Sequence, residues 1–405
     1  VAQVIDGFGA LTLSGNADFT ANAANTSNYV FTVASTGKVN VDSGSQFDIN
    51  GDLFNYASGQ FNTGEFNVEG TLRAQNITSI FTISTRISLA SSTANITNFN
   101  NDDVFATVNL ITSTGDFRVS NGKQQTLASG TGVSNLGSFT VGGLTGADTS
   151  IVSISQSYQQ SGTASTTVQN GARLIVGGNY LMNGGNLLVS GSRVEVSGTF
   201  NQTDGIVNLA TGALLVVNGP YTQTGGELFL TGGELVAGGG YNASGGTLSG
   251  DGVINGNLVT GGTIDPGSQG GLLPGNAGRF LVTGDVYLST GAVLHLDLGL
   301  PIIGGENGYD QLSISRTLTI GSEAIFELAF TLRPQPGDVY VPLVYGSRIG
   351  QFTTILGLQI DSNLYAEPTW TENGLRILIV EIPTPGTLLP LVASTMLVTR
   401  RRRDR

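Results

Sequence analysis

The chain of 405 residues contains no cysteine, which excludes disulfide bonds, thiolate metal sites and cysteine nucleophiles together. Charged residues make up only 11%, and long stretches of the helix formers Ala, Glu, Lys and Arg are missing. Helices are therefore not expected in most of the chain. The 60 glycines and 39% hydrophobic residues instead indicate a turn-rich all-β protein with enough apolar residues to bury a core.

Basic residues are also scarce, and they are concentrated at the C-terminus. The chain carries 17 Lys and Arg against 29 Asp and Glu, and its last six residues hold five of the arginines. Without those six residues the body has 12 basic and 28 acidic residues, a net charge of −16. Nucleic acids need clustered Lys and Arg to neutralise their phosphates, so we expect no nucleic-acid partner. An acidic exterior of this kind fits contact with water, cations or neutral glycans.

Aromatic residues recur in the middle of the chain at steps of 22, 20, 21 and 20 residues. They are Tyr158, Tyr180, Phe200, Tyr221 and Tyr241. Each opens a short polar stretch that ends in glycine, and apolar residues then alternate with polar ones at a period of two, as in strands with one face inward. A repeat of about 20 residues with glycine corners is typical of a parallel β-helix, in which each repeat forms one turn of a stack.

The same alternation occurs less regularly toward the N-terminus, as in the segment 51–72, so we expect the β-helix to cover residues 1–276. From residue 277 the apolar segments become longer and prolines punctuate them. This change predicts a small all-β domain over residues 277–381 that caps the open end of the stack. We predict the remaining segment, 382–405, as a sorting or membrane segment that contains a short apolar helix.

Two stretches of the chain resemble known surface proteins. The Gly-, Thr- and Asn-rich stretch 245–267 is similar to the last turns of autotransporter passenger domains and related adhesin-like repeats. The segment Tyr309-Asp310-Gln311-Leu312 resembles one that commonly follows such repeats. The resemblance implies a right-handed β-helix at a bacterial surface.

The C-terminus combines a spacer, an apolar run over residues 387–398 and a basic end. The order resembles the PEP-CTERM sorting signal of bacterial surface and exopolysaccharide-associated proteins, with Thr384 in place of the family's central glutamate. It implies recognition by an exosortase-like envelope enzyme. The spacer is Pro383, Thr384, Pro385 and Gly386, and the basic end holds Arg400, Arg401, Arg402, Arg403 and Arg405.

The apolar run of the tail is short for a membrane span. It has 12 residues, whereas a helix needs about 20 to cross the bilayer core. The length therefore favours a signal that is cut after recognition over a permanent anchor. At the other end, position 1 is Val, and no charged segment followed by an apolar one precedes Asp6. We interpret this start as mature or truncated, with a secretion signal already absent.

An enzymatic alternative, a β-helix polysaccharide lyase or hydrolase, needs convergent carboxylates. Asp102 and Asp103 form an adjacent acidic pair, but neighbouring strand residues point to opposite faces, and a polar turn explains the pair as well. His295 is the sole histidine, and it shares a strand face with Val293 and Asp297. No nucleophile motif such as Gly-x-Ser-x-Gly accompanies it, so we interpret it as a structural imidazole. We expect no catalytic residue, metal ion or cofactor.

The sequence thus predicts an exported, non-enzymatic structural or adhesin-like protein of a double-membrane bacterium. Its tail would sort or retain it at the cell envelope, with the body at the cell surface or in the extracellular matrix. The expected partners are the processing enzyme, the membrane through the tail, and exopolysaccharide or surface glycans.

Overall fold

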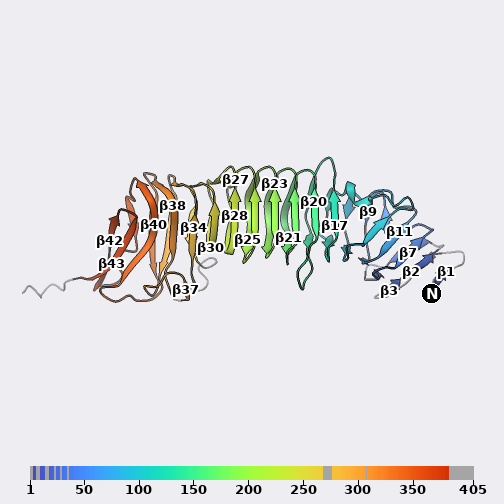
Figure 1. Cartoon of the computed structure of the whole chain (residues 1–405), viewed down its shortest axis with the longest axis horizontal. Helices are drawn as coiled ribbons and strands as arrows, with labels where there is room; N and C mark the ends of the chain where they lie inside the picture. The colour runs from blue at the N-terminus through green and yellow to red at the C-terminus, as the bar shows by residue number, and fades with distance from the viewer. Residues whose placement is uncertain are drawn as a thin grey trace, which may run out of the picture.

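The computed structural model describes residues 3–5, 10–13, 18–21, 24–27, 30–33, 36–267, 276–306 and 308–382. The protein is all-β, with 59% of its residues in strands, and the only helical element of the described residues is the short 3₁₀ helix η1 (Val104–Thr107). Short strands lie side by side along an elongated rod, with the N-terminal strands at one end and β42 and β43 at the other (Figure 1). The helix expected in the tail lies outside the described residues.

The strands follow one another with few other elements between them. The N-terminal strands are β1 (Gln3–Ile5), β2 (Ala10–Leu13), β3 (Asp18–Ala21), β4 (Ala24–Ser27), β5 (Val30–Val33), β6 (Lys38–Val41), β7 (Gln46–Ile49), β8 (Tyr56–Ala57), β9 (Gln60–Phe61), β10 (Glu65–Val68), β11 (Thr71–Ala74), β12 (Thr82–Ile83), β13 (Arg86–Leu89) and β14 (Asn95–Thr97). The central strands are β15 (Leu110–Ile111), β16 (Asp116–Val119), β17 (Gln124–Leu127), β18 (Val133–Asn135), β19 (Ser138–Val141), β20 (Ile151–Ile154), β21 (Tyr158–Gln169), β22 (Arg173–Val176), β23 (Tyr180–Ser190), β24 (Arg193–Val196), β25 (Phe200–Ala210), β26 (Leu214–Val217), β27 (Tyr221–Gln223), β28 (Glu227–Ala237), β29 (Tyr241–Ala243), β30 (Thr247–Asn255), β31 (Leu258–Thr260) and β32 (Thr263–Pro266). The C-terminal strands are β33 (Asn276–Ala277), β34 (Arg279–Val282), β35 (Val286–Leu288), β36 (Val293–Leu298), β37 (Gly305–Glu306), β38 (Gln311–Ile320), β39 (Ile325–Phe330), β40 (Val339–Ile349), β41 (Thr354–Leu356), β42 (Leu364–Thr371) and β43 (Gly374–Glu381).

Strands of successive turns pair in parallel, one repeat apart. β21 pairs with β23 and β23 with β25, so that Tyr158, Tyr180 and Phe200 occupy the same position in consecutive turns. The register continues through Tyr221 to Tyr241. Neighbouring rings of this series have centroids 4.5 to 5.2 Å apart. The aromatic ladder predicted from the repeat is confirmed.

Long strands run round a corner of the rod and join its faces into one sheet. β25 pairs with both β27 and β28, and the two series of pairings that start there meet again at β38. One series passes through β29, β31 and β35, and the other through β30 and β34. The pairings thus close a ring of nine strands within a large, mainly parallel sheet.

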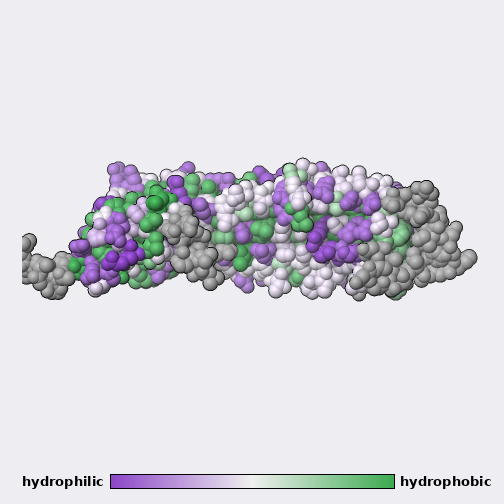
Figure 2. Space-filling view, turned by 90° about the horizontal axis from the view of Figure 1, so that it is seen from below, coloured by the Kyte–Doolittle hydropathy of each residue, from purple (hydrophilic) through white to green (hydrophobic). Residues whose placement is uncertain are grey.

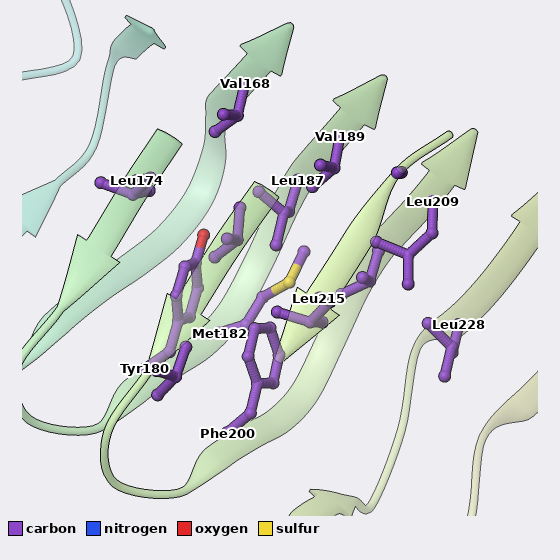
Figure 3. Packing of buried hydrophobic residues seen from close by; sticks show 14 of the residues in the cluster. Val168, Leu174, Tyr180, Met182, Leu187, Val189, Phe200, Leu209, Leu215 and Leu228 are labelled. Carbon is purple, nitrogen blue, oxygen red and sulfur yellow. The ribbon is translucent and has the colours of Figure 1, made fainter. Parts of the chain in front are cut away.

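The interior is a narrow stack of apolar side chains. Strands such as β6, β10 and β16 alternate strictly between a partly exposed and a buried residue, because successive side chains point to opposite faces. Tyr180, Met182 and Phe200 lie together in this interior (Figure 3), and all three are buried completely. Full burial of one large apolar side chain contributes roughly 1.5–3 kcal/mol, so the stack itself supplies the stability that disulfides cannot.

Buried glutamines satisfy the tyrosine hydroxyls of this core. Tyr180 and Tyr221 each donate to the side-chain oxygen of a glutamine in the preceding turn, Gln160 at 3.0 Å and Gln202 at 2.6 Å. Tyr241 donates in the same way to Gln223. Phe200 has no hydroxyl, and the corresponding residue of the turn before it is Met182, which offers no acceptor amide. A glutamine acceptor is therefore present where the next turn has a Tyr hydroxyl, and absent where the next turn has Phe200.

Parallel pairing continues across residue 277, where we expected a capping domain to begin. β30 pairs in parallel with β34, and the parallel series runs on through β38 to β40. β43 then pairs antiparallel with β40 and with β42, so a hairpin occupies the edge of the last parallel strand. At residues 276 and 277 β33 pairs antiparallel with β37 in a separate two-stranded sheet, while the main sheet stays parallel. The domain boundary there stays a prediction. In the C-terminal part of the main sheet, the change to antiparallel pairing comes at β40.

Candidate functional site

The residues predicted to form the sorting signal, Pro383 to Gly386 with the arginines of the basic end, lie outside the described residues. Their role stays a prediction. Among the residues that the structure describes, no helix is long and apolar enough to cross a membrane.

Asp102 and Asp103 belong to a capped turn. The carboxylate of Asp103 accepts a hydrogen bond from the backbone N–H of Phe105 at 3.0 Å and caps η1. The side-chain amide of Gln125 donates to the same carboxylate at 3.2 Å. Asp102 accepts instead from the side chain of Asn98 at 2.6 Å. These separate local contacts agree with the polar turn.

A more concentrated group of titratable side chains surrounds His295 on the outside of the rod. His295 and Glu327 are register partners in β36 and β39. Asp265 of β32 follows Ile264, whose partner is Leu294, so Asp265 occupies the same outward position one turn before His295. We call Asp265, His295, Asp297 and Glu327 the His295 cluster.

The imidazole of His295 lies between two carboxylates. Its Nε2 is 3.4 Å from Oδ1 of Asp297, and its Nδ1 is 3.3 Å from Oε2 of Glu327. Each ring nitrogen thus faces an acceptor, an arrangement that suits the doubly protonated, positively charged ring. The side chain of His295 is 27% exposed, so solvent reaches the cluster.

These surroundings shift the acid–base equilibria of the cluster. The hydrogen bond to Asp297, followed by that to Glu327, raises the pKa of His295 to about 9, although burial opposes the shift. Burial raises the pKa of Asp265 to about 6, an effect that His295 opposes and the other carboxylates nearby reinforce. At neutral pH the cluster therefore holds a charged imidazole, and it includes a carboxyl that titrates close to neutrality.

Asp310 holds the backbone beneath the cluster. Its buried carboxylate accepts hydrogen bonds from the backbone N–H groups of Gly278 and Asp297, both at 2.8 Å. Burial raises the pKa of Asp310 to about 8, against the effect of these two hydrogen bonds. Asp310 belongs to the segment Tyr309-Asp310-Gln311-Leu312, which resembles one that commonly follows surface repeats. The structure gives it a positioning role, because it joins Gly278, directly before β34, to Asp297 in β36.

The alternation within β36 correctly predicted that Val293, His295 and Asp297 share one face. Sequence reasoning missed Asp265 and Glu327, which come from other turns. Each of the two directly follows a buried apolar residue, Ile264 or Phe326, that pairs with Leu294, the residue before His295. That shared position is the signal that could have found them. Within the part of the chain that the structure describes, no group of three or more His, Asp and Glu side chains is arranged to hold a metal ion.

No protein-family model matches the chain, and a search of curated proteins gave no match.

Proposed function

We propose that this chain is an exported structural or adhesin-like protein, without enzymatic activity, built on a right-handed parallel β-helix. In this proposal the tail is a PEP-CTERM-like signal, read by an exosortase-like enzyme, that sorts or retains the body at the envelope of a double-membrane bacterium. The handedness and the surface location come from the resemblance to autotransporter and adhesin-like repeats. Residues 277–381 serve as the closing part of the rod.

One observation carries the proposal: a single register runs unbroken along the rod. Beginning at Asp18, each residue of this series pairs with its counterpart in the next turn. The series is Asp18, Lys38, Glu65, Arg86, Asp116, Ser138, Ser165, Asn186, Ile206, Glu227, Thr247, Thr263, Val293, Ile325 and Thr354. Such continuity suits a stiff spacer or scaffold, because each turn supports only its neighbours and the rod lengthens by addition of turns.

The exterior of the rod fits display in water. Figure 2 shows a face in which hydrophilic and near-neutral residues predominate along the middle of the rod, with hydrophobic residues denser toward the C-terminal end. Some charged side chains on the N-terminal half pair across turns, as Arg73 with Asp48 at 2.6 Å and Arg86 with Asp116 at 2.8 Å. Acidic residues outnumber basic ones in the body, and a net negative charge favours solubility and disfavours nucleic acid.

The tail is tested by deletion of residues 387–405 and fractionation of the cells. The proposal predicts that the intact protein is recovered with the envelope or the surface matrix, and that the truncated protein is lost from that fraction. The same distribution of the intact and the truncated protein among the cell fractions would contradict the sorting role. Replacement of Arg400 to Arg403 by Ser, with the apolar run kept, separates the contribution of the basic end.

The His295 cluster supports a second candidate function, a β-helix polysaccharide hydrolase. Asp265 and Glu327 occupy the same outward position two turns apart, a separation of about 9–10 Å at a strand spacing of roughly 4.8 Å. Inverting glycosidases place their two carboxyl groups at about 6.5–9.5 Å, and they need one with a raised pKa as general acid. Asp265 meets the second requirement. Release of reducing ends from polysaccharides that is lost in Asp265→Asn and kept in Asp251→Asn would establish this function in place of the first.

A further inference from the structure

A polar groove runs along the outside of the N-terminal half of the rod. It consists of a hollow of about 460 Å³ and a second of about 250 Å³, and the two meet at Ser88, which lines both. Outward side chains of successive strands form the floor. They are Thr20, Asn40, Asn67, Ser88, Arg118 and Thr140, and we call the hollow that they floor the N-terminal groove.

The floor is a ladder in strict register. Each of its residues pairs with the next, from Thr20 in β3 to Thr140 in β19. Since neighbouring turns are about 4.8 Å apart, the floor extends over roughly 24 Å and presents one polar side chain per turn. The groove is therefore long, straight and regularly spaced.

Two hydrogen bonds, one to the preceding turn and one within its own strand, hold the side-chain amide of Asn67 in place. The side-chain amide of Asn67 donates to Oδ1 of Asn40 at 3.0 Å and to the carboxylate of Glu65 at 3.0 Å. Oδ1 of Asn67 stays available as an acceptor. The side-chain hydroxyl of Ser88, in the next turn, makes no hydrogen bond with any described residue, so it is available as well. A ligand that enters the groove therefore meets an amide that is already oriented beside a hydroxyl without a partner.

Charged residues of both signs lie in or next to the groove. On the strands that form the floor, Glu65 pairs with Lys38 at 3.6 Å and with Arg86 at 3.2 Å, and Asp116 pairs with Arg86 and Arg118, both at 2.8 Å. Asp42 and Glu69 line the larger hollow. These three basic and four acidic residues nearly cancel, so the groove favours neither a polyanion nor a polycation.

A loop between two strands lines one end of the groove. Between β19 and β20 the chain forms a loop over residues 142–150, and the carboxylate of Asp148 accepts hydrogen bonds from the backbone N–H groups of Gly143 at 2.6 Å and Ser150 at 2.7 Å. It also accepts from Asn121 at 2.8 Å, in the adjacent turn. Leu144 lies on this fixed loop, 81% exposed, and lines the smaller hollow. Loops on one face of a repeat protein often mark the binding face.

We propose that the N-terminal groove binds a segment of a neutral, linear polysaccharide. The floor is straight and presents hydroxyl and amide groups, with Arg118 already paired with Asp116, and such groups match a chain of sugar hydroxyls. Leu144 offers an apolar surface to a ring face at one end. A protein partner would need an apolar patch at the centre of the site, which this floor lacks. The inference rests on the proposed surface function and names its ligand class.

The test uses the full chain and affinity electrophoresis through gels that contain neutral linear glucans, mannans or galactans, with an acidic polysaccharide for comparison. The wild type is expected to be retarded by at least one neutral polysaccharide. Ser88→Tyr fills the junction of the two hollows and Leu144→Ser removes the apolar surface, and each should weaken binding at least tenfold. Thr319→Tyr, at an outward position of β38, should bind as the wild type does. Circular dichroism of each variant checks the fold.

Absence of retardation by every neutral polysaccharide, or equal retardation of wild type and Ser88→Tyr, would overturn the inference. Its failure is distinguishable from failure of the proposed function, because the Ser88→Tyr protein still carries the tail. If the surface function holds, Ser88→Tyr reaches the envelope fraction whether or not the groove binds a glycan. If tail deletion leaves localisation unchanged, the proposed surface function fails. The electrophoretic result then still shows whether the groove binds a neutral polysaccharide.

Discussion

The hydroxyl of Tyr221 donates a hydrogen bond of 2.6 Å to Oε1 of Gln202, one turn earlier, and both side chains are buried inside the rod. The same glutamine donates from Nε2 to the backbone carbonyl groups of Gly205 and Glu227, both at 2.9 Å. A polar side chain in the core thus joins the aromatic ladder to the corner of the next turn. The register between neighbouring turns is fixed by chemistry as well as by shape.

Gln202→Met should destabilise the protein by about 1–3 kcal/mol, because it leaves the hydroxyl of Tyr221 buried without an acceptor. Adding Tyr221→Phe should recover about 1 kcal/mol, since the pair then matches the natural pair of Met182 and Phe200. Denaturant titration of the single and double variants measures the free energies of unfolding. Gln159→Met, at an exposed position two turns earlier, is the control. Strict additivity of the two changes would contradict the coupling.

Thermal stability should fall as the pH rises from about 4 to 9. The pKa of His295 is raised to about 9, so its stabilising effect is complete below the unfolded value of 6.5 and is lost as the pH rises through 9. Raised pKa values of about 6 for Asp265 and about 8 for Asp310, against 3.8 when unfolded, act in the same direction. In each case the folded state binds more protons than the unfolded state.

Other carboxylates reverse this trend at low pH. Glu65, Asp116, Asp148 and Glu195 have lowered pKa values, so their contribution is present above about 4.5 and is lost as the pH falls. The melting temperature should therefore be highest near pH 4 to 5. Calorimetric scans between pH 3 and pH 9 check the profile, and His295→Gln should flatten its alkaline side. A melting temperature that rises from pH 5 to pH 9 is incompatible with these shifts.

Asp310→Ala should cost about 1–3 kcal/mol for each of the two backbone N–H groups that lose their acceptor, those of Gly278 and Asp297. The loss should appear as faster amide hydrogen exchange at these two residues, before the rest of the rod is affected. Asp338→Ala is the control, because Asp338 accepts from the backbone N–H of Gln335 at an exposed turn where water replaces it. Equal effects of the two variants would show that burial of the Asp310 contacts is unimportant.

Gly250→Ala should destabilise the protein by about 2 kcal/mol or more. Gly250 has φ +100°, and a Cβ atom there would overlap the carbonyl oxygen of Leu230 in the preceding turn. Gly130→Ala should stay within about 1 kcal/mol of the wild type, since a Cβ atom at that position has open space around it. Denaturant midpoints of the two variants make the comparison, and similar midpoints would refute the steric argument.

Constant spacing allowed the central turns to be predicted from the sequence. The aromatic residues from Tyr158 to Tyr241 recur at 20 to 22 residues, so the pattern carries both the strands and their register. In the N-terminal half, paired residues such as Asn40 and Asn67, Glu65 and Arg86, or Arg86 and Asp116 are 27, 21 and 30 residues apart. Alternation still predicted strands there, but no fixed period could predict which strands lie together.

The same limit applies to the candidate sites. Alternation within one strand placed His295 beside Asp297, but Asp265 and Glu327 join them only through pairing between turns. The floor of the N-terminal groove and the Gln–Tyr contacts are likewise properties of neighbouring turns. The sequence contains a signal for the Gln–Tyr contacts, because Gln follows Tyr158, Phe200 and Tyr221 by two positions. Whether such a Gln is needed as an acceptor depends on the next turn, since a Tyr there has a hydroxyl to donate and a Phe has none.

Intact-mass measurement of the protein recovered from washed cell envelopes tests the central claim, an exported rod delivered by its tail, most directly. The account predicts an envelope species that ends close to the spacer of Pro383, Thr384, Pro385 and Gly386 and lacks the basic end. Recovery of the protein mainly from the cytoplasm, with Arg405 still attached, would contradict it.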